Sequence, residues 1–212
     1  PYILDEDKEL INRHNENAKA INILQDSIIP ETFLGSPSAP IILLNLNPGF
    51  AGFEEHRKSD TSEFKNAAFS NLVHRQSEYP FFLLDPQFRL TPGGRWWRKK
   101  LRVPIELVGD RVLSSKIHCI EWFPYSSEKF KRISRRRILH GQEYSFQLLR
   151  QAIQENKMVI VMRSLKVWFE TVPELENYDN YVCLKNPQNT AISPGNMPEQ
   201  AWNQFTELLC QP

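Results

Sequence analysis

Four short, mostly apolar runs dominate the hydrophobic pattern of the chain, and each ends in polar or turn-forming residues. They cover residues 41–46, 116–123, 158–162 and 181–184. Continuous apolar runs of this length are typical of strands that are covered on both faces, as in a parallel sheet. The pattern therefore predicts four buried strands.

Segments of helical periodicity separate these strands. Apolar residues recur at helical spacing over residues 5–23, 134–156, 165–169 and 198–209. Strands that alternate with helices predict right-handed crossovers and a parallel sheet. We expect an α/β fold, a three-layer sandwich in which helices flank a short four-stranded parallel sheet. Residues 33–40 are expected to be a turn-rich approach to the first strand.

The length of 212 residues suits one domain spanning 1–212, with an irregular insertion of loops and short helices at about 52–103. No apolar run is long enough to cross a bilayer, and the first residues do not resemble a signal peptide. The three cysteines are far apart, and the five histidines are scattered. We expect a cytoplasmic monomer that needs no membrane, metal or cofactor. His118, within a predicted strand, is expected to be a core residue.

Polar residues follow the predicted strands where each of them ends. Asn47-Pro48-Gly49 follows the first strand, Tyr125-Ser126 the second and Asn186-Pro187 the fourth. Ligands of open α/β sheets bind at the carboxyl ends of the strands. No pair of carboxylates was evident at these ends, so we expect amides and backbone groups to bind a neutral, hydrogen-bonding ligand. Each Asn-Pro step is also a common turn former, and that interpretation stays open.

Charge is nearly balanced overall, with 26 basic and 25 acidic residues, but two segments are strongly basic. One covers residues 95–102 and interleaves cations with Trp96 and Trp97; the other covers residues 129–137. Cations beside aromatic rings suit contact with phosphates and stacked bases. The alternative is an amphipathic helix with inward tryptophans and solvated charges. The candidate nucleic-acid backbone contacts are Arg95, Arg98, Lys99, Arg135 and Arg136.

Two of these motifs together resemble the uracil-DNA glycosylase superfamily. Residues 43–49, Leu-Leu-Asn-Leu-Asn-Pro-Gly, resemble the first motif of its mismatch-specific and single-strand-selective branches, and residues 186–189 resemble the second. The resemblance implies a hydrolase of DNA repair that removes a base flipped out of DNA. It implies that Asn47 positions the attacking water and that Asn186 contacts the departing base.

The resemblance and the strand ends together give a set of candidate binding residues. One of three phenylalanines is expected to stack on the base, and Ile192 or Met197 to fill the vacated stack. Departures from the family pattern, such as Asn45 in place of a glycine, leave the base undetermined. A non-catalytic nucleic-acid or nucleotide binding module and a protein for an unrelated ligand remain alternatives. The candidates are Asn45, Leu46, Pro48, Gly49, Phe50, Phe53, Phe64, Tyr125, Ser126, Pro187, Gln188 and Asn189.

Overall fold

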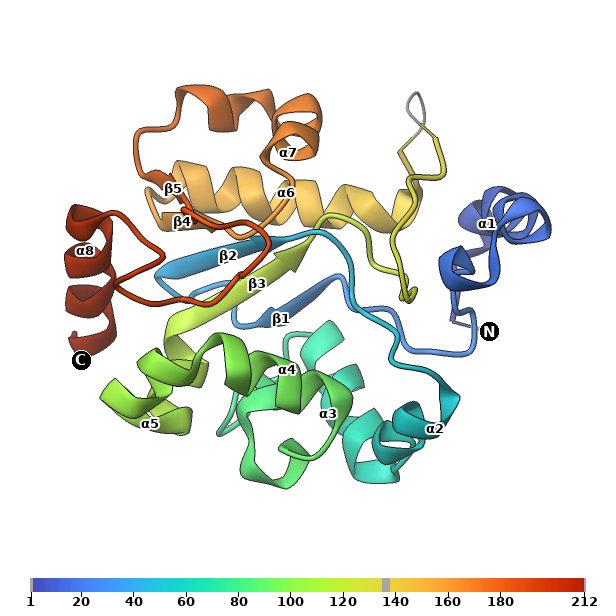
Figure 1. Ribbon diagram of the computed structural model, residues 1–212, viewed down its shortest axis with the longest axis horizontal. Coiled ribbons are helices and arrows are strands. Elements are labelled where there is room, and N and C mark those ends of the chain that lie inside the picture. The colour runs from blue at the N-terminus through green and yellow to red at the C-terminus, as the bar shows by residue number, and fades with distance from the viewer. Residues whose placement is uncertain (1, 135–137, 212) are drawn as a thin grey trace.

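The computed structural model of the chain describes residues 2–134 and 138–211, and a five-stranded sheet lies at its centre (Figure 1). Strand β2 (Ile41–Asn45) pairs in parallel with β3 (Ile117–Glu121) and β4 (Met158–Val161), and β5 (Tyr181–Cys183) pairs in parallel with β4. The four predicted strands are present, with bounds close to those expected. In order across the sheet, the strands are β1 (Phe33–Gly35), β3, β2, β4 and β5.

The edge strand β1 corrects the prediction of a four-stranded, purely parallel sheet. It pairs antiparallel with β3, so the sheet is mixed. Gly35 has a φ of +93°, and a Cβ there would lie 2.5 Å from the carbonyl oxygen of Ile117. Asn71 satisfies backbone hydrogen-bonding groups on the edge of β1 that faces away from β3. Its side chain accepts from the Gly35 N–H and donates to the Phe33 carbonyl. A side chain thus replaces a further strand at this edge.

Alternate residues of the central strand β2 face the two separate hydrophobic clusters of the molecule. Ile41 and Leu43 belong to one cluster, and Ile42 and Leu44 to the other. This period of two is that of a strand, and all five residues of β2 are buried. The continuous apolar run therefore reflects a sheet covered on both faces.

The helices form the two outer layers (Figure 1). One face of the sheet is covered by α1 (Asp5–Asn17), α6 (His140–Gln154) and α7 (Leu165–Thr171), and the other by α3 (Ser62–Leu72), α4 (Pro92–Lys100), α5 (Arg102–Lys116) and α8 (Glu199–Cys210). The α/β sandwich expected from the sequence is confirmed at this level. The remaining helical segments are α2 (Phe53–His56) and the 3-10 turns Ala20–Asn22, Arg57–Ser59, Phe82–Leu84, Pro86–Phe88 and Pro173–Asn177.

The segment 52–103, expected to be irregular, is largely helical and contributes much of one core cluster. Phe81, Leu84 and Trp97 are all at most 2% exposed and pack in the cluster that contains Leu43. The hydroxyl of Thr91 caps α4 by accepting from the Gly94 N–H, and Pro92 occupies the first turn. The segment between β2 and β3 therefore builds the helical layer on one face of the sheet.

None of the helices within residues 2–134 and 138–211 combines the length and hydrophobicity that crossing a bilayer requires.

Candidate functional site

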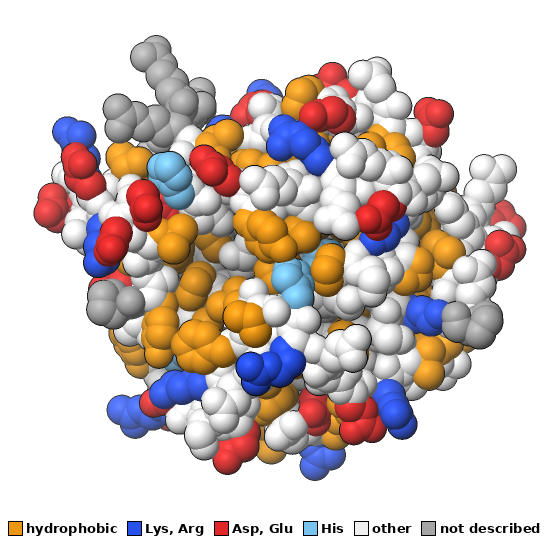
Figure 2. Space-filling view, turned by 180° about the vertical axis from the view of Figure 1, so that it is seen from behind, with side chains coloured by type: hydrophobic (Ala, Val, Ile, Leu, Met, Phe, Trp, Pro, Cys, Tyr) orange, Lys and Arg blue, Asp and Glu red, His pale blue; other side chains and the backbone are white. Residues whose placement is uncertain are grey.

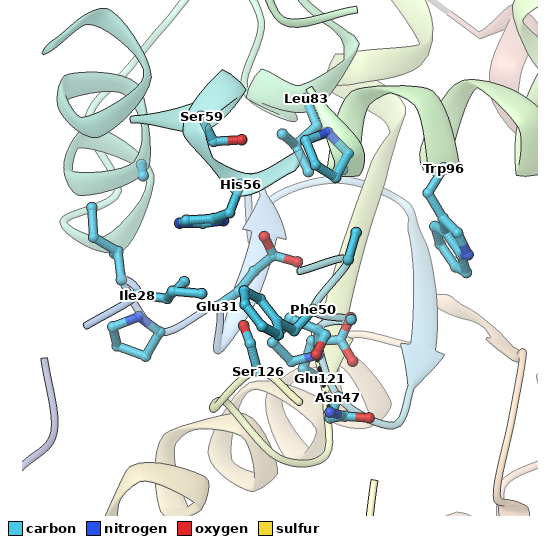
Figure 3. Close-up of a pocket in the computed structure, with 18 of the residues that line it drawn as sticks. Ile28, Glu31, Asn47, Phe50, His56, Ser59, Leu83, Trp96, Glu121 and Ser126 are labelled. Atoms are coloured by element: carbon cyan, nitrogen blue, oxygen red, sulfur yellow. Dashed lines mark hydrogen bonds between the residues drawn. The ribbon is translucent and has the colours of Figure 1, made fainter. Parts of the chain in front are cut away.

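A cavity of about 940 Å³ opens at the carboxyl ends of β2 and β3 (Figure 3). Its size is at the upper end of the range for small-molecule sites. The loop that follows β2 and parts of α2, α3 and α4 contribute to its wall. The structure brings many of the predicted residues to this one cavity: Asn45, Leu46, Asn47, Pro48, Gly49, Phe50, Phe53, Phe64 and Ser126.

The loops after β2 and β3 are joined by backbone hydrogen bonds. Gly49 and Ser127 form a parallel bridge, and the Phe50 N–H donates to the Ser127 carbonyl over 3.0 Å. The Ser127 N–H reaches the Pro48 carbonyl over 3.4 Å. These bonds extend the pairing of the two strands past their ends and hold the Asn47-Pro48-Gly49 turn in place.

The side chain of Asn47 has a defined orientation on the cavity wall. Its Nδ2 donates to the Pro48 carbonyl over 3.0 Å and to Ser127 Oγ over 3.2 Å. The Pro48 carbonyl can only accept, so this contact identifies the nitrogen of the amide. Among the hydrogen bonds of the described residues, none uses Oδ1 of Asn47. The amide oxygen is thus left as an acceptor for a water or a ligand.

Asn45 and Glu121 form the inner wall of the cavity, side by side at the ends of neighbouring strands. Residue pairing in the sheet places them opposite each other, and Asn45 Nδ2 donates to Glu121 Oε1 over 2.9 Å. Asn45 is 5% and Glu121 1% exposed. Within the described residues, Asn45 Oδ1 and Glu121 Oε2 have no hydrogen-bond partner. A buried polar atom without a partner has lost its water at a cost in free energy, and such atoms are rare in proteins.

A second carboxyl group, Glu31, lines the same cavity, and Figure 3 shows its side chain pointing inward. Burial raises the pKa of Glu31 to about 7. Burial also raises the pKa of Glu121 well above its usual range, and the nearby Glu31 raises it further. The expectation of a site without a pair of carboxylates is therefore wrong, because Glu31 and Glu121 both line the cavity. Glu121 was overlooked because it is a single acid within an apolar run, and Glu31 because it precedes an unpredicted strand.

Aromatic rings provide the apolar part of the cavity wall. Phe50 is buried and packs edge-to-face against Phe53, with 5.0 Å between the ring centroids. Phe53 itself is 63% exposed. Phe64 packs edge-to-face against two core phenylalanines. Trp96 also lines the cavity, and Arg163 lies over its ring at 5.9 Å. Lys100, from the basic segment 95–102, lies over the same ring at 5.6 Å from its centroid, so Trp96 joins an aromatic face to cations from two segments.

Several predicted residues lie away from the cavity. Tyr125 is 2% exposed, and its hydroxyl donates to the buried carboxylate of Asp7 over 2.9 Å. Ile192 and Met197 are buried in the core, so neither is available in this structure to enter a base stack. The segment Asn186-Pro187-Gln188-Asn189 is exposed in the loop after β5 and does not line the cavity.

Two of the five predicted backbone contacts have partners within the protein. Arg95 pairs with Glu55 and donates to the Leu90 carbonyl. Arg98 forms a half-buried ion pair with Asp110 at 2.6 Å, so its role is structural. Lys99 is exposed, and Arg135 and Arg136 lie outside the described residues.

Cations also line the cavity itself: Arg57, Lys65, Lys129 and Arg163. On the face of the molecule drawn in Figure 2, basic and acidic side chains are interspersed among those coloured. Four acidic residues line the same cavity, and Lys65 pairs with one of them, Asp60, so the wall carries charges of both signs. Within the described residues, no three His, Cys, Asp or Glu side chains are grouped as a metal site would need.

Comparison with known proteins gave no match to this chain, whether to a family model, to a curated protein or to a solved structure.

Proposed function

We propose that the chain is a hydrolase that removes a flipped-out base from DNA, with a fold and first motif like those of the uracil-DNA glycosylase superfamily. The observation that carries this proposal is the anchored amide of Asn47. Its nitrogen is held by Pro48 and Ser127, which leaves its oxygen free to orient a water at the cavity wall.

The chemistry is hydrolysis of an N-glycosidic bond. The water oxygen bonds to the sugar C1′ while the bond from C1′ to the base nitrogen breaks, and the electron pair leaves with the base. An amide can orient the water but is a poor base, so the reaction depends on stabilising the leaving base. The water also loses a proton, and Glu31 is a suitable acceptor, because it points into the cavity with a pKa of about 7.

The surroundings of Asn47 suit a base and its phosphates. The aromatic rings of Phe50, Phe53 and Trp96 offer faces and edges for stacking, and Arg163 and Lys129 supply positive charge on the cavity wall. Extrusion of a base costs a few kcal/mol of unstacking, which such contacts can offset. DNA is therefore the proposed partner.

A second candidate is a binding module of the same fold that holds a nucleic acid or nucleotide without cleaving it. The position of Asn186 favours this alternative. Its Oδ1 accepts from the N–H groups of Gln188 and Asn189, and the residue does not line the cavity. In this structure Asn186 is therefore not placed to make the contact with the departing base that the resemblance implies.

The test is abasic-site formation in oligonucleotides that carry uracil, mismatched bases or damaged bases. We expect the parent to release one of these bases, and Asn47→Ala to be slower by about two to three orders of magnitude, because the oriented water is lost. Asn203→Ala, at an exposed position of α8, is the control and should match the parent.

Base release that Asn47→Ala leaves unchanged would refute the role of this residue. No release across the panel, together with salt-sensitive binding of the oligonucleotides, would favour the binding module.

A further inference from the structure

The inner wall of the cavity has a hydrogen-bonding capacity that the proposed water chemistry does not use. Asn45 and Glu121 are both more than nine-tenths buried, and their mutual hydrogen bond occupies Nδ2 of one and Oε1 of the other. Oδ1 of Asn45 and Oε2 of Glu121 remain without a partner among the described residues. Since both residues line the cavity, a ligand is the natural source of the missing partners.

We propose that Asn45 and Glu121 determine the specificity of the cavity by binding the edge of a nucleobase on which an N–H donor adjoins an acceptor. This inference rests on the proposed function for the identity of the ligand as a base. It adds the residues that read that base and the hydrogen-bonding pattern that they require.

The protonation state of Glu121 determines whether its unpaired oxygen donates or accepts a hydrogen bond. The groups that act on its carboxyl are Glu31, Arg163, Cys119 and Asn45. Burial and Glu31 raise its pKa well above the usual range, outweighing the opposite effects of the hydrogen bond from Asn45 and of Arg163. A raised pKa favours the protonated carboxyl over the carboxylate. Oε1 already accepts from Asn45, which leaves Oε2 as the site of the proton and hence a donor.

The pair then presents one acceptor, Asn45 Oδ1, and one donor, Glu121 Oε2–H. A matching ligand edge has one N–H and one acceptor in neighbouring positions. The lactam edge of uracil or hypoxanthine has an N–H beside a carbonyl, and the amidine edge of cytosine or adenine has an amino group beside a ring nitrogen. Both wall residues are uncharged in this state, so the wall suits a neutral heterocycle better than a phosphate or a carboxylate.

Asn45 is held in place for this task by contacts on its backbone. Its carbonyl accepts from the indole N–H of Trp168 over 3.1 Å, and Trp168 is fully buried. Residues whose own positions are fixed by packing make precise binding contacts.

The first experiment uses the unaltered protein and varies the ligand. Binding of uracil, hypoxanthine, cytosine and adenine is measured by calorimetry, each with a methyl group on the nitrogen that bears the sugar in DNA. They are compared with the uracil and hypoxanthine derivatives in which a second methyl group replaces the edge N–H, at N3 of uracil and at N1 of hypoxanthine. We expect at least one base to bind, and methylation of the edge nitrogen of a lactam to weaken its binding about tenfold or more, because Asn45 Oδ1 is left unpaired. A preference for uracil and hypoxanthine assigns the lactam edge, and one for cytosine and adenine the amidine edge.

The second experiment varies the wall. Glu121→Gln keeps a donor and an acceptor of similar shape at every pH, and it should bind within about threefold of the parent at neutral pH. Glu121→Leu removes both and should weaken binding about tenfold or more. Raising the pH until Glu121 ionises should weaken binding by the parent but not by Glu121→Gln. Glu207→Gln, on the exposed side of α8, is the control.

The inference is overturned if none of the bases binds, if the bases methylated at the edge nitrogen bind as well as those that keep the edge N–H, or if parent and Glu121→Gln share one pH profile. Its failure is distinct from that of the proposed function. Excision that is insensitive to Glu121 refutes the inference alone, whereas edge-dependent binding without excision refutes only the hydrolase.

Discussion

The two Asn-Pro turns of the chain follow strands of the same sheet, yet they use the asparagine amide in opposite ways. Asn47, after β2, donates from Nδ2 to two oxygens, one of them Ser127 in a neighbouring loop. Asn186, after β5, accepts with Oδ1 from the N–H groups of the two residues that close its own turn. One amide oxygen is left for a ligand and the other is consumed by local structure.

This contrast shows that an Asn-Pro motif predicts a binding site only where the surrounding structure leaves one polar atom of the amide without a partner. An asparagine that caps its own turn is a common structural element. An asparagine whose nitrogen is tied to another loop is positioned by tertiary structure, and only the loop pairing between Gly49 and Ser127 makes that possible here.

The largest expected effect concerns the carboxyl group beside the first turn. Glu31 has a folded pKa of about 7 against an ordinary value of 4.5. Between these values the unfolded chain has lost the proton while the folded protein keeps it, so stability falls as the pH rises. The shift corresponds to a loss of at most about 3 kcal/mol between pH 4.5 and 7.

Urea unfolding across this pH range measures the effect, and Glu31→Gln should flatten the decline because the amide does not titrate. Glu16→Gln, at an exposed position of α1, is the matched control and should keep the slope of the parent. If parent and Glu31→Gln lose stability equally over this range, the cavity around Glu31 is wetter than its burial indicates.

The sequence was sufficient for most of the sheet, because each buried strand is a short apolar run with a polar end. It was insufficient for β1, whose three residues lie in a segment rich in glycine, serine and proline. That strand is held by contacts from distant parts of the chain: pairing with β3 on one side and Asn71 of α3 on the other. Local pattern carries no information about such partners.

The candidate site could be predicted only where a motif lies directly at the end of a strand. Asn47 and its neighbours line the cavity as expected, whereas Glu31 and Glu121 come together from separate segments, and neither belongs to a motif. Tyr125 was misplaced for a related reason. A residue after a strand can turn toward the ligand or toward the core. The Tyr125 hydroxyl turns toward the core, where it donates to Asp7, a residue far away in sequence.

The next prediction concerns Ser127, which we interpret as a positioning residue for Asn47. Ser127→Ala removes one of the two groups that hold the amide nitrogen, so the amide is less restrained and can present the wrong atom to the water. We expect kcat for base release to fall about tenfold with KM unchanged, because ground-state binding of the base is not altered.

Ser127→Thr retains a hydroxyl and should restore most of the rate. Ser145→Ala is the matched control: this serine of α6 is also buried, and its hydroxyl has no hydrogen-bond partner among the described residues. An unchanged kcat in Ser127→Ala would show that the Pro48 carbonyl alone orients the amide. A higher KM would instead mean that Ser127 contacts the base.

The smallest effect is expected at Asn186, and it completes the comparison of the two turns. Asn186→Ala removes the acceptor for the N–H groups of Gln188 and Asn189, both of which can turn to water because the loop is exposed. Stability should fall by about 1 kcal/mol or less, as measured by urea unfolding, and base release should stay within about threefold of the parent. Asn186→Asp keeps the acceptor oxygen and should retain the stability of the parent. A loss of base release in Asn186→Ala as large as that in Asn47→Ala would contradict the comparison, because it would require the loop after β5 to close over the cavity when DNA binds.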